Sequence, residues 1–161
     1  MIKDSGCRRS FDTGAVRDIQ DGKGRPSLMP LEVVYMLTHD IVIYYLGRFK
    51  DDGDTENLVK VLSHFSRVYD DGLTKASPEA ITTQRYTTML LEVSKHFEEG
   101  AAKYGDNNWQ KGIPAECYMD SAIRHYLKWR REDNDEDHAR AFVWNVMCCI
   151  WEVDCRNEGQ T

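Results

Sequence analysis

The sequence contains no apolar run that approaches the roughly 20 residues needed to cross a bilayer. Its first residues, MIKDSGCRRSFDTG, lack the apolar core of a signal peptide. It also contains no Walker loop, no Rossmann glycine pattern and no nucleophile elbow. We therefore expect a cytoplasmic protein without membrane contact, whose chemistry does not depend on these common signatures.

The five cysteines are odd in number and form no CxxC pair. Cys148 and Cys149 are adjacent in an apolar run, where a free cysteine behaves as a small hydrophobic residue. The pattern favours reduced thiols over a disulfide or zinc framework.

The net charge of −6 argues against binding a nucleic acid polymer through a broad basic surface. Residues 1–27 nevertheless hold six Lys or Arg against four Asp. A basic arm on an acidic body suits metal ions in the body and a phosphate ligand shared between the two. The alternative is that the arm is a solvated tail.

Apolar periodicity predicts one all-α domain over residues 1–161, an α-helical bundle of about five helices. Residues 1–27 are rich in glycine and show no helical period, so we expect an irregular arm before a bundle of residues 28–155. Ser77, Pro78 and Glu79 resemble a helix start. The sequence AFVWNVMCCIW is apolar nearly all round, which places the last helix at the centre. The expected helices cover residues 30–49, 58–69, 78–103, 115–131 and 134 onward.

Polar residues follow one flank of the expected helix around residues 86–103. Glu92, His96, Glu99 and Lys103 are spaced by four, three and four residues. Carboxylates one to two turns apart can hold Mg²⁺ or Mn²⁺, which prefer oxygen ligands. The alternative is a solvated edge with ion pairs between neighbouring turns.

The last helix carries His138, Asn145 and Glu152 at seven-residue intervals, so these side chains share a face. Asn145 lies in an apolar stretch, where an unpaired amide would cost a few kcal/mol. It needs either an interhelical hydrogen bond or a ligand.

The helix before it carries Asp120, Arg124 and Lys128 along one side, with His125 beside them. This spacing fits a surface salt-bridge ladder, or one metal ligand followed by two phosphate clamps. The preceding loop offers Trp109 for stacking on a base and Asn108 for reading its edge. Further candidates for substrate binding there are Lys103, Tyr104 and Lys111.

Three segments, KYGDNNWQKGIP, RHYLKW and FVWN, resemble the phage-encoded dATP/dGTP diphosphohydrolase family. The resemblance extends over nearly the whole chain, including the arm. That family is related to the MazG-like nucleoside triphosphate pyrophosphohydrolases, which are all-α, use Mg²⁺ or Mn²⁺ and commonly pair their subunits. The resemblance implies a homo-oligomer in the host cytoplasm that hydrolyses a purine (deoxy)nucleoside triphosphate, dGTP or dATP, to the monophosphate and pyrophosphate.

The chain departs from the MazG-like pattern, because the ExxE and ExxD motifs do not appear in the expected helices. Glu92 is followed by Lys95, and the last helix offers His138, Ala139, Arg140 and Ala141. The resemblance therefore leaves the metal ligands to be chosen from Glu92, Glu98, Glu99, Asp120, Asp137, His138 and Asn145. Asn145 is also a candidate for substrate binding.

The implied mechanism is in-line attack of a metal-bound water on the α-phosphate. The outer phosphates would be held by Arg124, Lys128, Lys103 and the arm residues Lys23 and Arg25. His125 and Glu99 are the candidate general bases.

Two other functions fit parts of the sequence. His39 and Asp40 form an HD dipeptide, but an HD phosphohydrolase needs an earlier histidine and His39 is the first in the chain. A non-catalytic acidic adaptor that binds a host protein stays the alternative to an enzyme.

Overall fold

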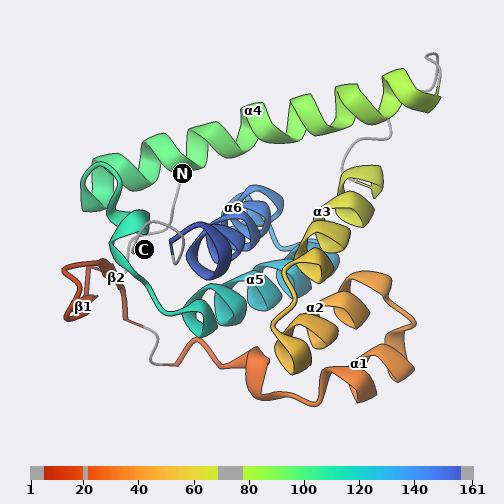
Figure 1. The fold of residues 1–161 in the computed structure, drawn as a ribbon, viewed down its shortest axis with the longest axis horizontal. Coiled ribbons are helices and arrows are strands. Elements are labelled where there is room, and N and C mark those ends of the chain that lie inside the picture. Colours follow the sequence, from red (N-terminus) through yellow and green to blue (C-terminus); the bar gives the residue numbers. More distant parts are fainter. Residues whose placement is uncertain (1–5, 20–21, 69–77, 157–161) are drawn as a thin grey trace.

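Helices make up nearly all of the regular structure in the computed structural model, which describes residues 6–19, 22–68 and 78–156 (Figure 1). The all-α prediction is confirmed, with a helical bundle accompanied by one small two-stranded sheet. The α-helices of the described residues are α1 (Leu31–Thr38), α2 (Ile41–Asp52), α3 (Glu56–Val68), α4 (Pro78–Tyr104), α5 (Ala115–Arg130) and α6 (His138–Ile150).

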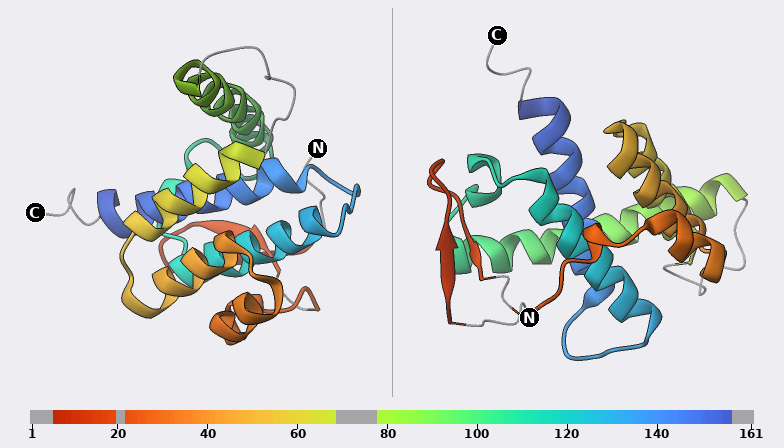
Figure 2. Two further views of the ribbon diagram at one scale, coloured as in Figure 1. Left: turned by 90° about the vertical axis from the view of Figure 1, so that its right-hand side faces the viewer. Right: turned by 90° about the horizontal axis from the view of Figure 1, so that it is seen from below.

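Helix α6 lies at the centre of the bundle, as its apolar sequence predicts. It packs against α3, α4 and α5, and Figures 1 and 2 show it between α4 and α5. Phe142, Val143 and Val146 are completely buried. Burial of a side chain of this size contributes about 1.5–3 kcal/mol. Asp137 caps the helix by accepting a hydrogen bond from the backbone N–H of Arg140.

The single helix expected over residues 30–49 is wrong, because the structure divides it into α1 and α2. His39 ends α1 in the left-handed conformation, with φ of 51°. Asp40 then begins α2 by accepting a hydrogen bond from the backbone N–H of Val42. Apolar spacing continues across the break, and therefore the period alone does not reveal it.

The arm is not wholly irregular, which corrects the expectation of an irregular segment over residues 1–27. Strands β1 (Arg8–Ser10) and β2 (Val16–Asp18) form an antiparallel hairpin in which Arg9 lies opposite Arg17. A short 3₁₀ turn, η1 (Pro26–Leu28), leads into α1. Strands of three residues are too short to show the alternation that marks a strand in a sequence.

The arm is attached to the bundle and is not a solvated tail. Ala15 is completely buried in the hydrophobic core. The side chain of Asn108 exchanges two hydrogen bonds with the backbone of Val16, of 2.9 and 2.8 Å. Ser27 donates from its backbone N–H to the buried carboxylate of Asp120 at 3.1 Å. These contacts hold the hairpin against the loop after α4 and hold η1 against α5.

Among the cysteines whose side chains the structure describes, Cys7, Cys117, Cys148 and Cys149 are free. Burial raises the pKa of the Cys149 thiol to about 12, so it stays protonated at neutral pH. None of the helices in the described part of the chain combines the length and apolar character that a membrane span requires. Pro78 begins α4 as expected. The proposed cap Ser77 lies outside the described residues, as does Tyr69, the expected end of the second helix.

Candidate functional site: a cationic cavity between the arm and the helices

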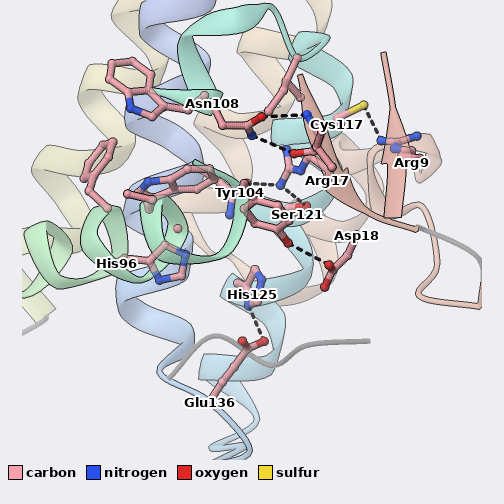
Figure 3. Close-up of a pocket in the computed structure, with 18 of the residues that line it drawn as sticks. Arg9, Arg17, Asp18, His96, Tyr104, Asn108, Cys117, Ser121, His125 and Glu136 are labelled. Carbon is pink, nitrogen blue, oxygen red and sulfur yellow. Dashed lines mark hydrogen bonds and ion pairs between the residues drawn. The ribbon is translucent and has the colours of Figure 1, made fainter. Parts of the chain in front are cut away.

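A cavity of about 870 Å³ lies where the arm meets α4, α5, α6 and the loop between α4 and α5 (Figure 3). This volume is within the range of about 300–1,000 Å³ that is usual for small-molecule sites. The hairpin supplies Arg17 and Asp18, α4 supplies His96 and Tyr104, and α5 supplies Arg124. Segments that are far apart in the sequence therefore form one site.

Arg17 extends from β2 to the two central helices. Its guanidinium donates to Ser121 Oγ of α5 at 3.1 Å and to Asn145 Oδ1 of α6 at 2.9 Å. It also lies over the ring of Tyr118, 5.0 Å from the centroid. Its Nη1 atom is buried and has no hydrogen-bond partner. A fixed guanidinium with a donor to spare is suited to binding a phosphate oxygen.

Asp18, the next residue, is the centre of a charged network at the edge of the cavity. Tyr104 Oη donates to it at 2.8 Å and Lys103 Nζ at 3.1 Å, while Lys23 Nζ lies 3.9 Å away. Burial acts to raise the pKa of Asp18, but the hydrogen bonds from Tyr104 and Lys103 outweigh it and lower the pKa. The carboxylate is therefore ionised at neutral pH and fixes the cations around it.

Arg124 brings a second guanidinium close to Arg17. It donates to Ser121 Oγ at 3.1 Å, so the same hydroxyl receives hydrogen bonds from both arginines. Burial, and then the charge of Arg17, lower the pKa of Arg124. Burial is also the main cause that lowers the pKa of Lys23, and repulsion from Arg124 acts in the same direction. Cations that repel one another in a cavity are stabilised by an anionic ligand.

Aromatic side chains form another part of the wall. Phe97 lies edge-on to Trp109 at 5.5 Å and to Trp144 at 5.9 Å between ring centroids. Two polar atoms among these rings, Trp144 Nε1 and His96 Nδ1, are buried without a hydrogen-bond partner. Burial, and then the charge of Arg140, lower the pKa of His96 to about 4, so this imidazole is neutral. The cavity therefore combines a cationic part with an aromatic part.

Two histidines and two acids meet at the end of the cavity near the loop between α5 and α6. The Nδ1 atoms of His125 and His138 are 3.0 Å apart, and Glu136 Oε1 lies 3.5 and 3.6 Å from them. His138 Nε2 is 2.7 Å from Asp135 Oδ1. His125, Glu136 and Asp135 line the cavity, and Figure 3 shows His125 beside Glu136. These residue types are all able to hold a metal ion.

About half of the sequence-predicted site residues line the cavity. Both candidate general bases lie in α4 or α5, but only His125 faces the cavity; Glu99 is ion-paired with Arg140 at 3.2 Å. The predicted residues that line it are Lys23, Glu98, Tyr104, Asn108, Trp109, Arg124, His125, Lys128 and Asn145.

The structure does not bring the predicted metal ligands together. Glu92 lies outside the cavity and pairs with Lys95. Asp120 accepts hydrogen bonds from Ser27 and from Arg25 Nε at 3.2 Å, and Asp137 caps α6. Of the predicted set, His138 alone belongs to a group of three close potential ligands among the described residues.

The remaining predicted substrate residues have mixed positions. Lys103 and Arg25 do not line the cavity; they bind acids of this chain, Asp18 and Asp120 respectively. Lys111 is exposed and does not line it. The HD dipeptide is also elsewhere, since Asp40 binds Tyr126 and Arg130 and His39 is exposed. Asn145 does not have the interhelical hydrogen bond that was one of its two expected partners; its amide accepts from Arg17 of β2 at 2.9 Å and donates to the carbonyl of Ala141 in its own helix at 2.8 Å.

Sequence reasoning missed Arg17, Asp18, His96, Ser121 and Glu136. Arg17 and Asp18 follow no helical period, and a hairpin of two short strands gave no local signal. His96 was noticed as part of a polar flank but not as a residue of the site. Glu136 lies in the acidic stretch NDED at residues 134–137, where acids before a helix are common without any role in a site. The sequence indicated a role for Arg17 only by placing it among the basic residues of the arm.

The fold and the cavity together define an all-α protein with one pocket that has a cationic wall and an aromatic wall. A family model described as dATP/dGTP diphosphohydrolase, N-terminal, matches residues 67–161, and the chain belongs to this family. The match covers α4, α5 and α6, whereas the arm, α1, α2 and nearly all of α3 precede it. No curated protein and no solved structure matches the chain significantly.

Proposed function

We propose that the chain hydrolyses dATP or dGTP to the monophosphate and pyrophosphate. Membership of the family supports the reaction class. The observation that carries the proposal is the guanidinium of Arg17, which is held by Ser121 and Asn145 and keeps a buried donor in the cavity. The position of Arg124 and Lys23 beside it gives the site the charge that a triphosphate requires.

In the proposed reaction, water attacks the α-phosphorus and the bond to the oxygen that bridges to the β-phosphorus breaks. Pyrophosphate leaves with the electron pair of that bond. Arg17, Arg124 and Lys23 hold the phosphate oxygens and stabilise the charge that develops on them. Of the two predicted bases, His125 faces the cavity. Its pKa is lowered well below the usual value by burial and then by Arg124, so its imidazole is neutral.

The aromatic part of the cavity is the proposed site of the purine. Phe97, Trp109 and Trp144 supply apolar ring surface, and Trp144 Nε1 is a buried donor able to bind a purine nitrogen or oxygen. Asn108 was expected to read the base, but its amide is bonded on both sides to Val16. We therefore assign Asn108 to positioning the arm.

We also propose that turnover needs Mg²⁺ or Mn²⁺. Such an ion neutralises triphosphate charge and activates water when it is bound. The pairing of subunits and the phage context stay predictions. No observation on this structure favours the alternative of a non-catalytic adaptor.

The test is to incubate the protein with each of the eight common ribo- and deoxyribonucleoside triphosphates and Mg²⁺ or Mn²⁺, and to resolve the products by chromatography. We expect dAMP or dGMP with an equal amount of pyrophosphate. Arg17→Met should lower kcat/KM by on the order of 100-fold, because one fixed donor is lost. Arg48→Met is the control, since Arg48 lies on α2, outside the cavity, and pairs with Asp52. Release of orthophosphate, or no turnover of any triphosphate, would contradict the proposal.

A further inference from the structure

The residues His125, Glu136 and His138 direct three ligand atoms toward one point at the wall of the cavity. We propose that these residues bind one divalent transition-metal ion, in a site with two imidazole nitrogens and one carboxylate oxygen. The proposal rests on the proposed function only for the role of the ion in catalysis. The binding itself can be measured without a nucleotide.

The distances between the three atoms fit a single ion. His125 Nδ1, His138 Nδ1 and Glu136 Oε1 are separated by 3.0, 3.5 and 3.6 Å. A point at an equal distance from the corners of such a triangle lies about 2 Å from each of them. This matches the metal–nitrogen and metal–oxygen bond lengths of about 2.0–2.2 Å found in zinc sites.

Asp135 prepares His138 for this role. Its Oδ1 atom lies 2.7 Å from His138 Nε2, so the imidazole carries its proton on Nε2 and donates it to the carboxylate. The lone pair of His138 is then on Nδ1, the atom that faces His125 and Glu136. A carboxylate that binds the outer nitrogen of a histidine is the usual support of a metal-bound imidazole. The positions of His125, Asp135, Glu136 and His138 are therefore all consistent with an ion bound at Nδ1 of His138.

A second group on the other side of His138 is less suitable. It consists of Asp133, Asp135 and Nε2 of His138. Asp133 is already ion-paired with Arg131 at 2.5 Å, and Asp135 is exposed. His138 itself is only 1% exposed, and the side chains of His125 and Glu136 are 15% and 13% exposed. The ligand side chains of the first group are therefore better shielded from solvent than those of the second.

The ligand types decide the class of ion. Mg²⁺ prefers oxygen ligands, whereas imidazole nitrogens suit later transition-metal ions such as Fe²⁺, Ni²⁺ and Zn²⁺. The set is therefore different from the carboxylate sites of MazG-like enzymes that the resemblance implied. Mg²⁺ can still accompany the triphosphate, but we expect the resident ion to be a transition metal.

The position of the group leaves the ion accessible to a substrate. His125 and Glu136 line the same cavity as Arg17 and Arg124. Three protein ligands with remaining positions open to a cavity are typical of catalytic rather than structural metal sites. A metal-bound His125 uses Nδ1 as a ligand, so in the loaded protein it is a metal ligand and not a general base.

The experiment is a titration of the chelator-treated full chain with Co²⁺, followed by its visible absorption spectrum. Calorimetric titrations with Zn²⁺, Mn²⁺ and Mg²⁺ accompany it. We expect one equivalent of Co²⁺ to give the intense visible bands of a four- or five-coordinate ion, and Mg²⁺ to bind much more weakly than Zn²⁺. Glu136→Gln and His138→Gln should lose the spectrum, and Asp135→Asn should weaken binding by about 10–100-fold.

The controls are Glu116→Gln and His39→Asn, because both residues are exposed and lie outside the cavity. Asparagine also tolerates the left-handed conformation of His39. Circular dichroism shows whether each variant is folded; Glu136→Gln is nearly isosteric and serves where the His138 variant fails to fold. Unchanged Co²⁺ binding in the folded Glu136 variant, or no binding by the parent chain, would overturn the proposal.

The two proposals fail separately. Co²⁺ binding that depends on Glu136, without turnover of any triphosphate, would remove the proposed function and keep the metal site. Full turnover by Glu136→Gln with Mg²⁺ alone would keep the function and exclude this group from the reaction.

Discussion

His96 shows how its surroundings fix the protonation of one side chain. The imidazole is packed against Trp144, with 5.3 Å between the ring centroids. Burial is the main cause that lowers its pKa to about 4, and Arg140 adds repulsion. Glu99 and Asp137 act in the opposite direction, but their effect is smaller. The ring is neutral when the protein is folded and takes up a proton near pH 6.5 when it is unfolded.

We therefore expect His96 to make stability depend on pH. Its contribution is fully present above about pH 6.5 and is lost as the pH falls toward 4, because the unfolded chain then binds the extra proton. The loss amounts to roughly 3 kcal/mol in the free energy of unfolding. Urea unfolding at pH 7 and pH 5 should show a smaller decrease for His96→Gln than for the parent chain. Equal decreases in the two proteins would contradict the assignment.

At the scale of elements, Asp40 joins two helices that the sequence presents as unrelated. It caps α2 through the N–H of Val42. Its carboxylate also accepts hydrogen bonds from Tyr126 Oη at 2.7 Å and from Arg130 Nη1 at 2.7 Å, both on α5. Tyr126 is almost completely buried, so its hydroxyl has few alternatives. The break between α1 and α2 is therefore stabilised by the helix that lines the cavity.

Asp40→Ala should destabilise the protein by about 2–4 kcal/mol. The loss of a helix cap costs about 1 kcal/mol, and a buried hydroxyl left without an acceptor costs about 1–3 kcal/mol. Urea unfolding at neutral pH measures this difference. Asp51→Ala, at an exposed position near the end of α2, is the matched control and should change stability by less than about 0.5 kcal/mol. A loss no larger in the Asp40 variant than in the control would show that Tyr126 finds another partner.

The sequence predicted α4 and α5 well because each is long and has a regular apolar period. It predicted α6 from an almost continuous apolar run, but the helix begins at His138 and not at residue 134, because Asp137 is its cap. It did not predict the break at His39, since apolar residues continue on both sides of it. It placed Arg124, His125 and Asn145 in a candidate site because polar groups beside apolar ones need a partner. It could not choose among Glu92, Glu99 and Asp120, because each is paired within the chain and pairing depends on tertiary contacts. The hairpin and the loop that carries Glu136 also line the cavity, but the sequence did not predict them because neither segment has a periodic signal.

At the scale of the whole molecule, the cavity depends on the contact between the arm and the helices. The family match begins at residue 67, so the helical walls belong to the matched region and the hairpin does not. Arg17 and Asp18 nevertheless bind Asn145 and Tyr104 within that region. The matched region alone therefore contains only part of the proposed triphosphate site.

Removal of residues 1–24 should reduce turnover by more than 100-fold and lower Tm by several degrees. The site loses Arg17, Asp18 and Lys23, while the core loses Ala15. Arg25 and Ser27 stay in place, so the buried carboxylate of Asp120 keeps its partners. The truncated chain should keep its helical circular dichroism spectrum. Unchanged kcat and KM in this protein would show that the arm takes no part in the reaction.

Arg17 and Asn145 are separated by 128 positions along the chain. A ribosome synthesises the hairpin first and α6 nearly last, and folding during synthesis starts from the N-terminal side. The guanidinium of Arg17 therefore gains its acceptor on α6 only after Asn145 has been added and has left the ribosome. An incomplete chain that ends before α6 contains Ser121 but lacks Asn145, so it has one of the two acceptors that hold this guanidinium. Under the proposed function, fragments that end before α6 should therefore not hydrolyse triphosphates at the rate of the complete chain.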